Sequence, residues 1–181
     1  VVGELVNRGA WVGANSGLVS YEGLKYQLER MRNDSRVRSV ILDIDSPGGE
    51  AVGFDVAAQA VQRVASEKRV VAVVNGMAAS AAYALASGAT KIVTTPTGVA
   101  GSIGVVMMHV DMSRALEAEG VTPTLIFAGQ HKVDGNPFEP LPENVRADLQ
   151  AEVNAFYDDA EARFEMLLNI FKVFGHIPEY G

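Results

Sequence analysis

The segment RVVAVVNGMAASAAYALASGA, residues 69–89, decides the fold because it joins two patterns. Its first part is rich in β-branched residues, which favours a buried strand, and its second part is rich in alanine, which favours a helix. It carries no charge after Arg69, but its Asn75, Gly76 and alanine content argue against a membrane span. We therefore expect a buried strand that leads into a buried helix, with Ser80 at the junction.

Strand and helix patterns alternate along the rest of the chain. Apolar residues spaced by three and four predict helices at 17–34, 51–68, 113–120 and about 142–171. Short apolar runs predict strands at 37–45, 90–96, 103–111 and 122–129. This alternation predicts an α/β fold with a mostly parallel core sheet. No repeat or linker divides the sequence, so we expect residues 1–181 to form one domain.

Composition argues against several classes of function. The formal net charge is −7 and the basic residues are scattered, so no nucleic-acid-binding surface is predicted. The absence of cysteine removes thiol catalysis, zinc–thiolate sites and disulfides. No secretory signal is visible at the start, and we expect a cytoplasmic protein. No motif indicates a metal or a cofactor, so none is expected.

Two loops lie where a strand ends and a helix begins, a place where free backbone N–H groups gather. The first is SPGGE, residues 46–50, whose glycines can direct N–H groups at a developing oxyanion but which can equally be an ordinary turn. The second contains Ser80, which is either a nucleophile among small neighbours or a helix N-cap. If Ser80 is the nucleophile, the amide of Ala81 is a second oxyanion donor.

A serine nucleophile needs a base, and the chain offers three histidines and five lysines. No histidine lies in a context that demands a triad. Lys132 stands out because it follows an apolar strand pattern in a turn rich in Gly and Pro, and a desolvated lysine can be neutral and accept a proton. Ser102 lies in a glycine-rich loop before a strand pattern, which disfavours a phosphate loop; it could orient a lysine amine.

Two other arrangements have strand spacing but lack convergent partners. Asp43 and Asp45 share a strand face and could mimic a paired-carboxylate site. His109 and Asp111 have the spacing of metal ligands. We assign no site to either.

Four motifs in order resemble the signal peptide peptidase A-like serine peptidases of the Clp protease/crotonase superfamily: DIDSPGGE, NGMAASAAYALASGA, AGSIGVV and AGQHKVDGNPFEPLPE. The resemblance extends over about residues 37–153. It implies a Clp protease/crotonase-like fold of repeated β-β-α units, and assembly into rings or stacked oligomers.

The same resemblance implies a role for each candidate site residue. Ser80 matches the nucleophile, and Lys132 matches the general base of a Ser-Lys dyad. Ser102 matches the serine that holds the lysine amine. The backbone amides of Gly49 and Ala81 match the oxyanion hole.

The segments SYEGL, ASAAYALASGA and HKVDGNPFEPLPE are most similar to the phage and prophage branch of this family, the head-maturation proteases. Such a protein would cleave capsid or scaffold proteins, in the host cytoplasm or the prohead interior, as a homo-oligomer without a membrane span. Three alternatives stay open: a bacterial signal peptide peptidase, a crotonase-like acyl-CoA enzyme, and a non-catalytic assembly module.

Overall fold

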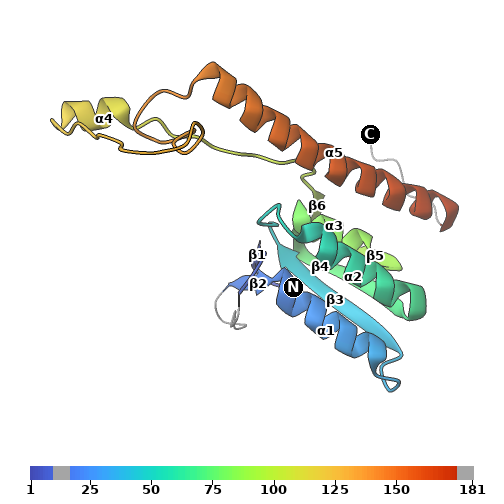
Figure 1. Ribbon diagram of the computed structural model, residues 1–181. Coiled ribbons are helices and arrows are strands. Elements are labelled where there is room, and N and C mark those ends of the chain that lie inside the picture. The colour runs from blue at the N-terminus through green and yellow to red at the C-terminus, as the bar shows by residue number, and fades with distance from the viewer. Residues whose placement is uncertain (10–16, 175–181) are drawn as a thin grey trace. The chain divides into compact units, whose positions relative to one another are not determined.

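The computed structural model describes residues 1–9 and 17–174, with the side chains of this part up to Asp158. The chain divides into two compact units. The first comprises Val1–Gly104 together with the chain from Asp159 onward, and the second comprises Val105–Asp158. Their secondary-structure elements are labelled in Figure 1.

The first unit is built on a parallel sheet. Its strands β3 (Ser39–Ser46), β4 (Arg69–Ala79) and β5 (Lys91–Thr94) lie side by side, and β6 (Val99–Gly101) pairs with the end of β4. All three pairings are parallel. The predicted α/β class with a mostly parallel sheet is therefore confirmed. A shorter parallel pair precedes this sheet, formed by β1 (Glu4–Val6) and β2 (Leu18–Ser20).

Helices cover one face of the sheet with apolar side chains. They are α1 (Tyr21–Asn33), α2 (Phe54–Glu67) and α3 (Ala81–Ser87), which lie against β3 and β4 in Figure 1. β3 alternates as a one-sided strand should, because Val40, Leu42 and Ile44 are buried while Ile41 is 70% exposed. The shared core contains the following side chains from all of these elements: Leu28, Ile44, Val61, Val64, Val70, Val74 and Leu85.

The second unit contains α4 (Ser113–Ala118) and the first half of α5 (Glu143–Phe174). The strands predicted at 103–111 and 122–129 are wrong, because both segments run without strand pairing in the part of the chain that the structure describes. Their apolar side chains stay exposed, with Val106 at 90% and Ile126 at 96%. An apolar run becomes a strand only where a neighbouring strand accepts its hydrogen bonds, and neither run has such a neighbour.

The prediction that the uncharged segment 70–89 is a strand followed by a helix is confirmed, since β4 and α3 divide it. Within residues 1–9 and 17–174, no helix has both the length and the apolar composition that a membrane crossing requires. The long helix predicted at about 142–171 is α5. That residues 1–181 act as one domain stays a prediction.

Candidate active site

Ser80 lies directly between β4 and α3 with an unusual backbone. Its φ is 52° and its ψ is −124°, a region that residues with a side chain seldom occupy. Its N–H donates to the carbonyl of Gly101 at the end of β6, at 2.8 Å. Ser80 occupies the N-cap position of α3, but its hydroxyl makes no capping hydrogen bond to the helix. The junction therefore holds a serine whose side chain does not cap the helix.

The SPGG turn packs against this serine through Gly48. A Cβ placed on Gly48 would lie 2.8 Å from Ser80 Cβ, 2.8 Å from the Ala79 carbonyl oxygen and 3.2 Å from the Ala81 nitrogen. Gly48 also has a φ of 97°, which favours glycine. The buried hydroxyl of Ser46 accepts the Gly48 N–H at 3.2 Å and fixes the turn from inside.

The amide of Gly49 faces away from the neighbouring strand. Leu5 donates its N–H to the Gly48 carbonyl at 2.8 Å and accepts the Glu50 N–H at 2.9 Å. In a parallel ladder, a residue flanked in this way directs its own N–H to the opposite side. A side chain at Gly49 would collide with the Leu5 carbonyl, so only glycine fits there.

Ala81 is the first residue of α3, where backbone N–H groups have no intrahelical acceptor. Its side chain and that of Ala82 belong to the hydrophobic core, at 5% and 0% exposed. These methyl groups thus anchor the start of α3 and fix the position of the Ala81 amide.

Ser102 follows β6 and is the other described non-glycine residue with positive φ, at 56°. It is adjacent to Gly101, whose carbonyl accepts the Ser80 N–H. The first unit therefore brings together three segments that are distant in the sequence: the SPGG turn, the Ser80 junction and the Gly101–Ser102 turn.

Lys132 lies in the second unit, in an exposed turn that begins at Gly129. Its N–H donates to the Gly129 carbonyl at 3.3 Å. Beside it, His131 Nδ1 lies 2.8 Å from Asp134 Oδ2. Ser80 and Lys132 thus belong to different units.

Asn136 fastens the end of the Lys132 turn. Its Nδ2 donates to the Val133 carbonyl at 2.9 Å and to Glu139 Oε1 at 2.7 Å, and its Oδ1 accepts the Phe138 N–H at 2.9 Å. Its carbonyl lies 3.0 Å from His109 Nε2, which acts as the donor in this contact. Sequence reasoning missed Asn136; the only signal was its position within the Gly/Pro-rich turn.

The sequence model of peptidase family S49 matches residues 62–160, more than half of the 181 residues. The chain belongs to peptidase family S49. The match covers Ser80, Ser102 and Lys132, and it agrees with the predicted resemblance to signal peptide peptidase A-like enzymes.

Curated relatives of this S49 chain include phage proteins. It is 45% identical to the head-tail preconnector protein GP5 of Enterobacteria phage P21, over 86% of this chain and 31% of that protein. It is 42% identical to the capsid assembly protease C of Escherichia phage lambda, over 86% and 35%. It is 29% identical to a putative signal peptide peptidase SppA of Enterococcus faecium, over 77% and 41%. The predicted resemblance to the phage branch is confirmed, and the chain spans about a third of the two phage proteins.

Among solved structures, the S49 chain matches an enoyl-CoA hydratase/isomerase from Pseudoalteromonas atlantica T6c. The TM-score is 0.41 at 17% identity, over 84% of this chain and 79% of that one. This likeness concerns the fold alone.

The two discounted arrangements have structural roles in this S49 chain. Asp111 Oδ1 accepts the Ser113 N–H at 2.9 Å at the start of α4. Hydrogen bonding with the Ser113 side chain, and then with this N–H, lowers the pKa of the Asp111 carboxyl. Asp45 Oδ1 accepts the Met77 N–H at 3.1 Å. Within the described residues, no group of three or more acidic or histidine side chains is arranged to hold a metal ion.

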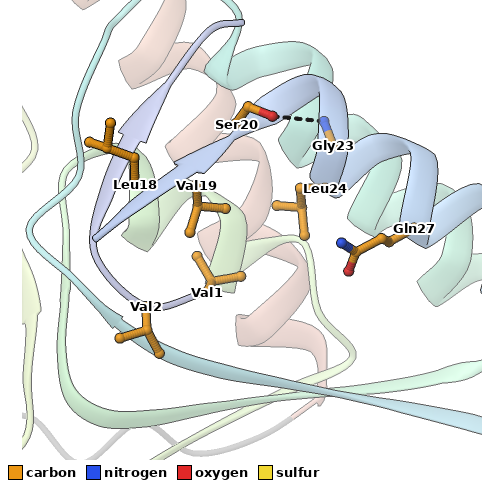
Figure 2. Close-up of a pocket in the computed structure, with 8 residues that line it drawn as sticks. All are labelled: Val1, Val2, Leu18, Val19, Ser20, Gly23, Leu24 and Gln27. Atoms are coloured by element: carbon orange, nitrogen blue, oxygen red, sulfur yellow. Dashed lines mark hydrogen bonds between the residues drawn. The ribbon is translucent and has the colours of Figure 1, made fainter. Parts of the chain in front are cut away.

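A pocket of about 320 Å³ lies at the N-terminal strands rather than beside Ser80. Its lining is mostly apolar (Figure 2), with Val1, Val19 and Leu24 facing the space and Gln27 at its edge. The Ser20 hydroxyl at its wall accepts the Gly23 N–H at 3.0 Å, which caps α1. None of the residues that line it is a candidate for catalysis.

Proposed function

We propose that this S49 chain carries the catalytic centre of a serine endopeptidase, with Ser80 as nucleophile. The observation that carries the proposal is the backbone of Ser80 at the β4–α3 junction, with φ at 52° and a hydroxyl unused by the helix. Backbone strain of this kind costs about 1–3 kcal/mol and persists only where the surroundings impose it, most often at functional sites. A sharp strand-to-helix turn is also how other hydrolases present a nucleophilic serine.

In the proposed reaction, Lys132 is the general base. Its neutral Nζ takes the Ser80 hydroxyl proton as Ser80 Oγ attacks the peptide carbonyl and forms a tetrahedral oxyanion. Collapse of this intermediate breaks the C–N bond, and the Lys132 ammonium gives its proton to the leaving amine. Lys132 then takes a proton from water as the water oxygen attacks the acyl carbonyl. The bond between Ser80 Oγ and the acyl carbon breaks, and the Lys132 ammonium returns its proton to Ser80 Oγ.

The amides of Gly49 and Ala81 are the proposed oxyanion hole. The Gly49 N–H is directed away from Leu5, and the Ala81 N–H begins a helix, where the dipole favours negative charge. Ser102, in a strained turn one residue from the Ser80 hydrogen-bond acceptor, is proposed to hold the Lys132 amine.

Lys132 is exposed in its own unit, whereas a lysine base must lose water to be neutral near pH 7. We therefore propose that the first unit, of the same copy or of a neighbouring one, covers Lys132 when the site assembles. The exposed apolar side chains of Val106, Met108 and Ile126 suit a homo-oligomer, because surfaces of this kind mark association sites.

The proposed substrates are capsid or scaffold proteins during phage head maturation, in the host cytoplasm or the prohead interior. A relative 42% identical to this chain is named a capsid assembly protease, which supports this class. Signal peptides are the alternative, since another relative is named a putative signal peptide peptidase. A non-catalytic assembly module is the second alternative.

The test is cleavage of a fluorescently labelled unfolded protein by the wild type, Ser80→Ala, Lys132→Ala and His131→Ala, each at several protein concentrations. We expect Ser80→Ala and Lys132→Ala to fall to background, His131→Ala to stay active, and specific activity to rise with concentration. An active Ser80→Ala variant would show that Ser80 is not the nucleophile.

The other outcomes separate the remaining alternatives. If Lys132→Ala is active and His131→Ala is not, the base is His131, which Asp134 already contacts at 2.8 Å. If the wild type cleaves neither unfolded protein nor capsid protein nor signal peptide at any concentration, the chain is an assembly module. Preference for capsid protein or for signal peptides decides the substrate class.

A further inference from the structure

β4 bulges shortly before Ser80. β3 and β4 pair in register as far as Ile44 and Val74, and pairing resumes at Ser46 and Ala78. Between these points β3 contributes one residue and β4 contributes three. A bulge bends its strand, and it therefore changes the direction in which the chain enters the next segment.

The side chain of Asp45, the single β3 residue opposite the bulge, fills it. Its Oδ1 accepts the Met77 N–H at 3.1 Å, in place of a ladder hydrogen bond. Gly76 lies against the same carboxylate: a Cβ there would come within 2.5 Å of Oδ1 and 2.8 Å of Cγ. With a φ of 131°, Gly76 also has a conformation that favours glycine. The bulge is therefore shaped around the Asp45 carboxylate.

This contact lies at the base of the two segments that form the candidate site. On β3, Asp45 immediately precedes the SPGG turn, and on β4, Met77 is followed by two alanines and then Ser80. Further along, Gly48 touches Ser80. The Asp45–Met77 hydrogen bond thus joins the two strands just before the SPGG turn and the Ser80 junction.

We propose that Asp45 is a positioning residue that holds the β4 bulge and so fixes Ser80 against the SPGG turn. The inference rests on the proposed role of Ser80. Asp45 is exposed, so water can replace its oxygen at the Met77 N–H and the loss of folding stability is small. The bulge, however, loses the group around which it is shaped. A shift of about 1 Å in a catalytic group can cost on the order of 10²-fold in rate.

The test compares Asp45→Ala with Asp45→Asn, which keeps an oxygen acceptor of nearly the same shape. Asp43→Ala is the matched control, because Asp43 lies on the same exposed face of β3, two residues earlier. We expect Asp45→Ala to lower kcat by roughly 10–100-fold with little change in KM. We expect Asp45→Asn and Asp43→Ala to stay within about threefold of the wild type, since each keeps an acceptor for the Met77 N–H.

Amide hydrogen exchange at Met77 gives a second readout that needs no activity. Asp45→Ala should accelerate it at least about tenfold, and Asp43→Ala should not, with thermal unfolding confirming that both variants fold. An inactive wild type, or an active Ser80→Ala, would count against the proposed function alone, and exchange would still test the bulge. Unchanged exchange and kcat in Asp45→Ala, or an Asp45→Asn variant as impaired as Asp45→Ala, would overturn the positioning role.

Discussion

Gly48 and Ser80 touch with no room for a side chain between them, since a Cβ on Gly48 would lie 2.8 Å from Ser80 Cβ. The contact explains why the turn after β3 ends in two glycines. Gly48 lets the turn approach the serine, and Gly49 lets it pass the Leu5 carbonyl. The absence of a side chain at each position lets the backbone of this turn lie against Ser80, the proposed nucleophile.

Gly48→Ala should therefore abolish activity while leaving most of the fold intact. Overpacking of this kind costs about 1–3 kcal/mol, and the displaced Ser80 should lose on the order of 10²-fold or more in kcat/KM. Gly120→Ala is the control, because Gly120 also has a positive φ, 73°, but has no atom near the position of a Cβ. It should cost about 1–2 kcal/mol and leave kcat/KM unchanged. Equal activity losses in both variants would show that backbone strain, not the Ser80 contact, is responsible.

Asn136→Ala should loosen the turn that carries Lys132. The variant removes the side-chain hydrogen bonds to the Val133 carbonyl, to Glu139 and to the Phe138 N–H. We expect kcat to fall about tenfold and the pH dependence of kcat to move, because the environment of the proposed base changes. Asn154→Ala on α5, whose Oδ1 accepts only from Gln150 at 2.9 Å among the described contacts, should behave as the wild type. A wild-type pH profile in Asn136→Ala would contradict this role.

Lys68→Met should destabilise the first unit without changing the chemistry of the site. Lys68 Nζ donates to the carbonyls of Met31 and Asp34 at the C-terminal end of α1, at 2.7 Å each. Hydrogen bonds from a charged group contribute about 1.5–3 kcal/mol, and a partly exposed one lies at the lower end. Urea unfolding should show a loss of about 1–2 kcal/mol, whereas Lys25→Met on the exposed side of α1 should show less than about 0.5 kcal/mol. Equal losses in both would mean that the helix end does not need Lys68.

Glu29 should give the fold an acid-sensitive component. Hydrogen bonds from Arg32 and then Arg63 hold the pKa of the Glu29 carboxyl below its ordinary value of 4.5. A carboxyl whose pKa is lower in the folded state stabilises the fold, and this contribution is complete at pH values above its unfolded-state pKa. The contribution disappears as the pH falls through the folded-state pKa. Glu29→Gln should therefore lose less stability than the wild type on acidification below pH 4.5, measured as the urea midpoint at each pH. Identical slopes for the two proteins would exclude this contribution.

Local pattern was sufficient for the elements whose burial repeats along the chain. The β-branched run before Asn75 and the alanine-rich run after Ser80 become β4 and α3. The apolar side chains of each run repeat with the spacing of a strand or a helix and are buried in the same core. Pattern failed at 103–111 and 122–129, where apolar residues imply burial but the partner that would bury them lies outside the segment. The hydrogen bond of Asp45 could not be predicted from the sequence for a similar reason, since its partner Met77 is set by the register of β4.

The sequence by itself determined the parallel α/β fold, the place of Ser80 at a strand–helix junction and the membership of family S49, because residue type and spacing encode these properties locally. Only the tertiary structure decided that Gly48 touches Ser80, that Gly101 accepts the Ser80 N–H and that Asp45 fills the bulge. Each of these contacts joins segments far apart in the chain. Their geometry depends on strand register and on the φ of single glycines, which no local pattern specifies.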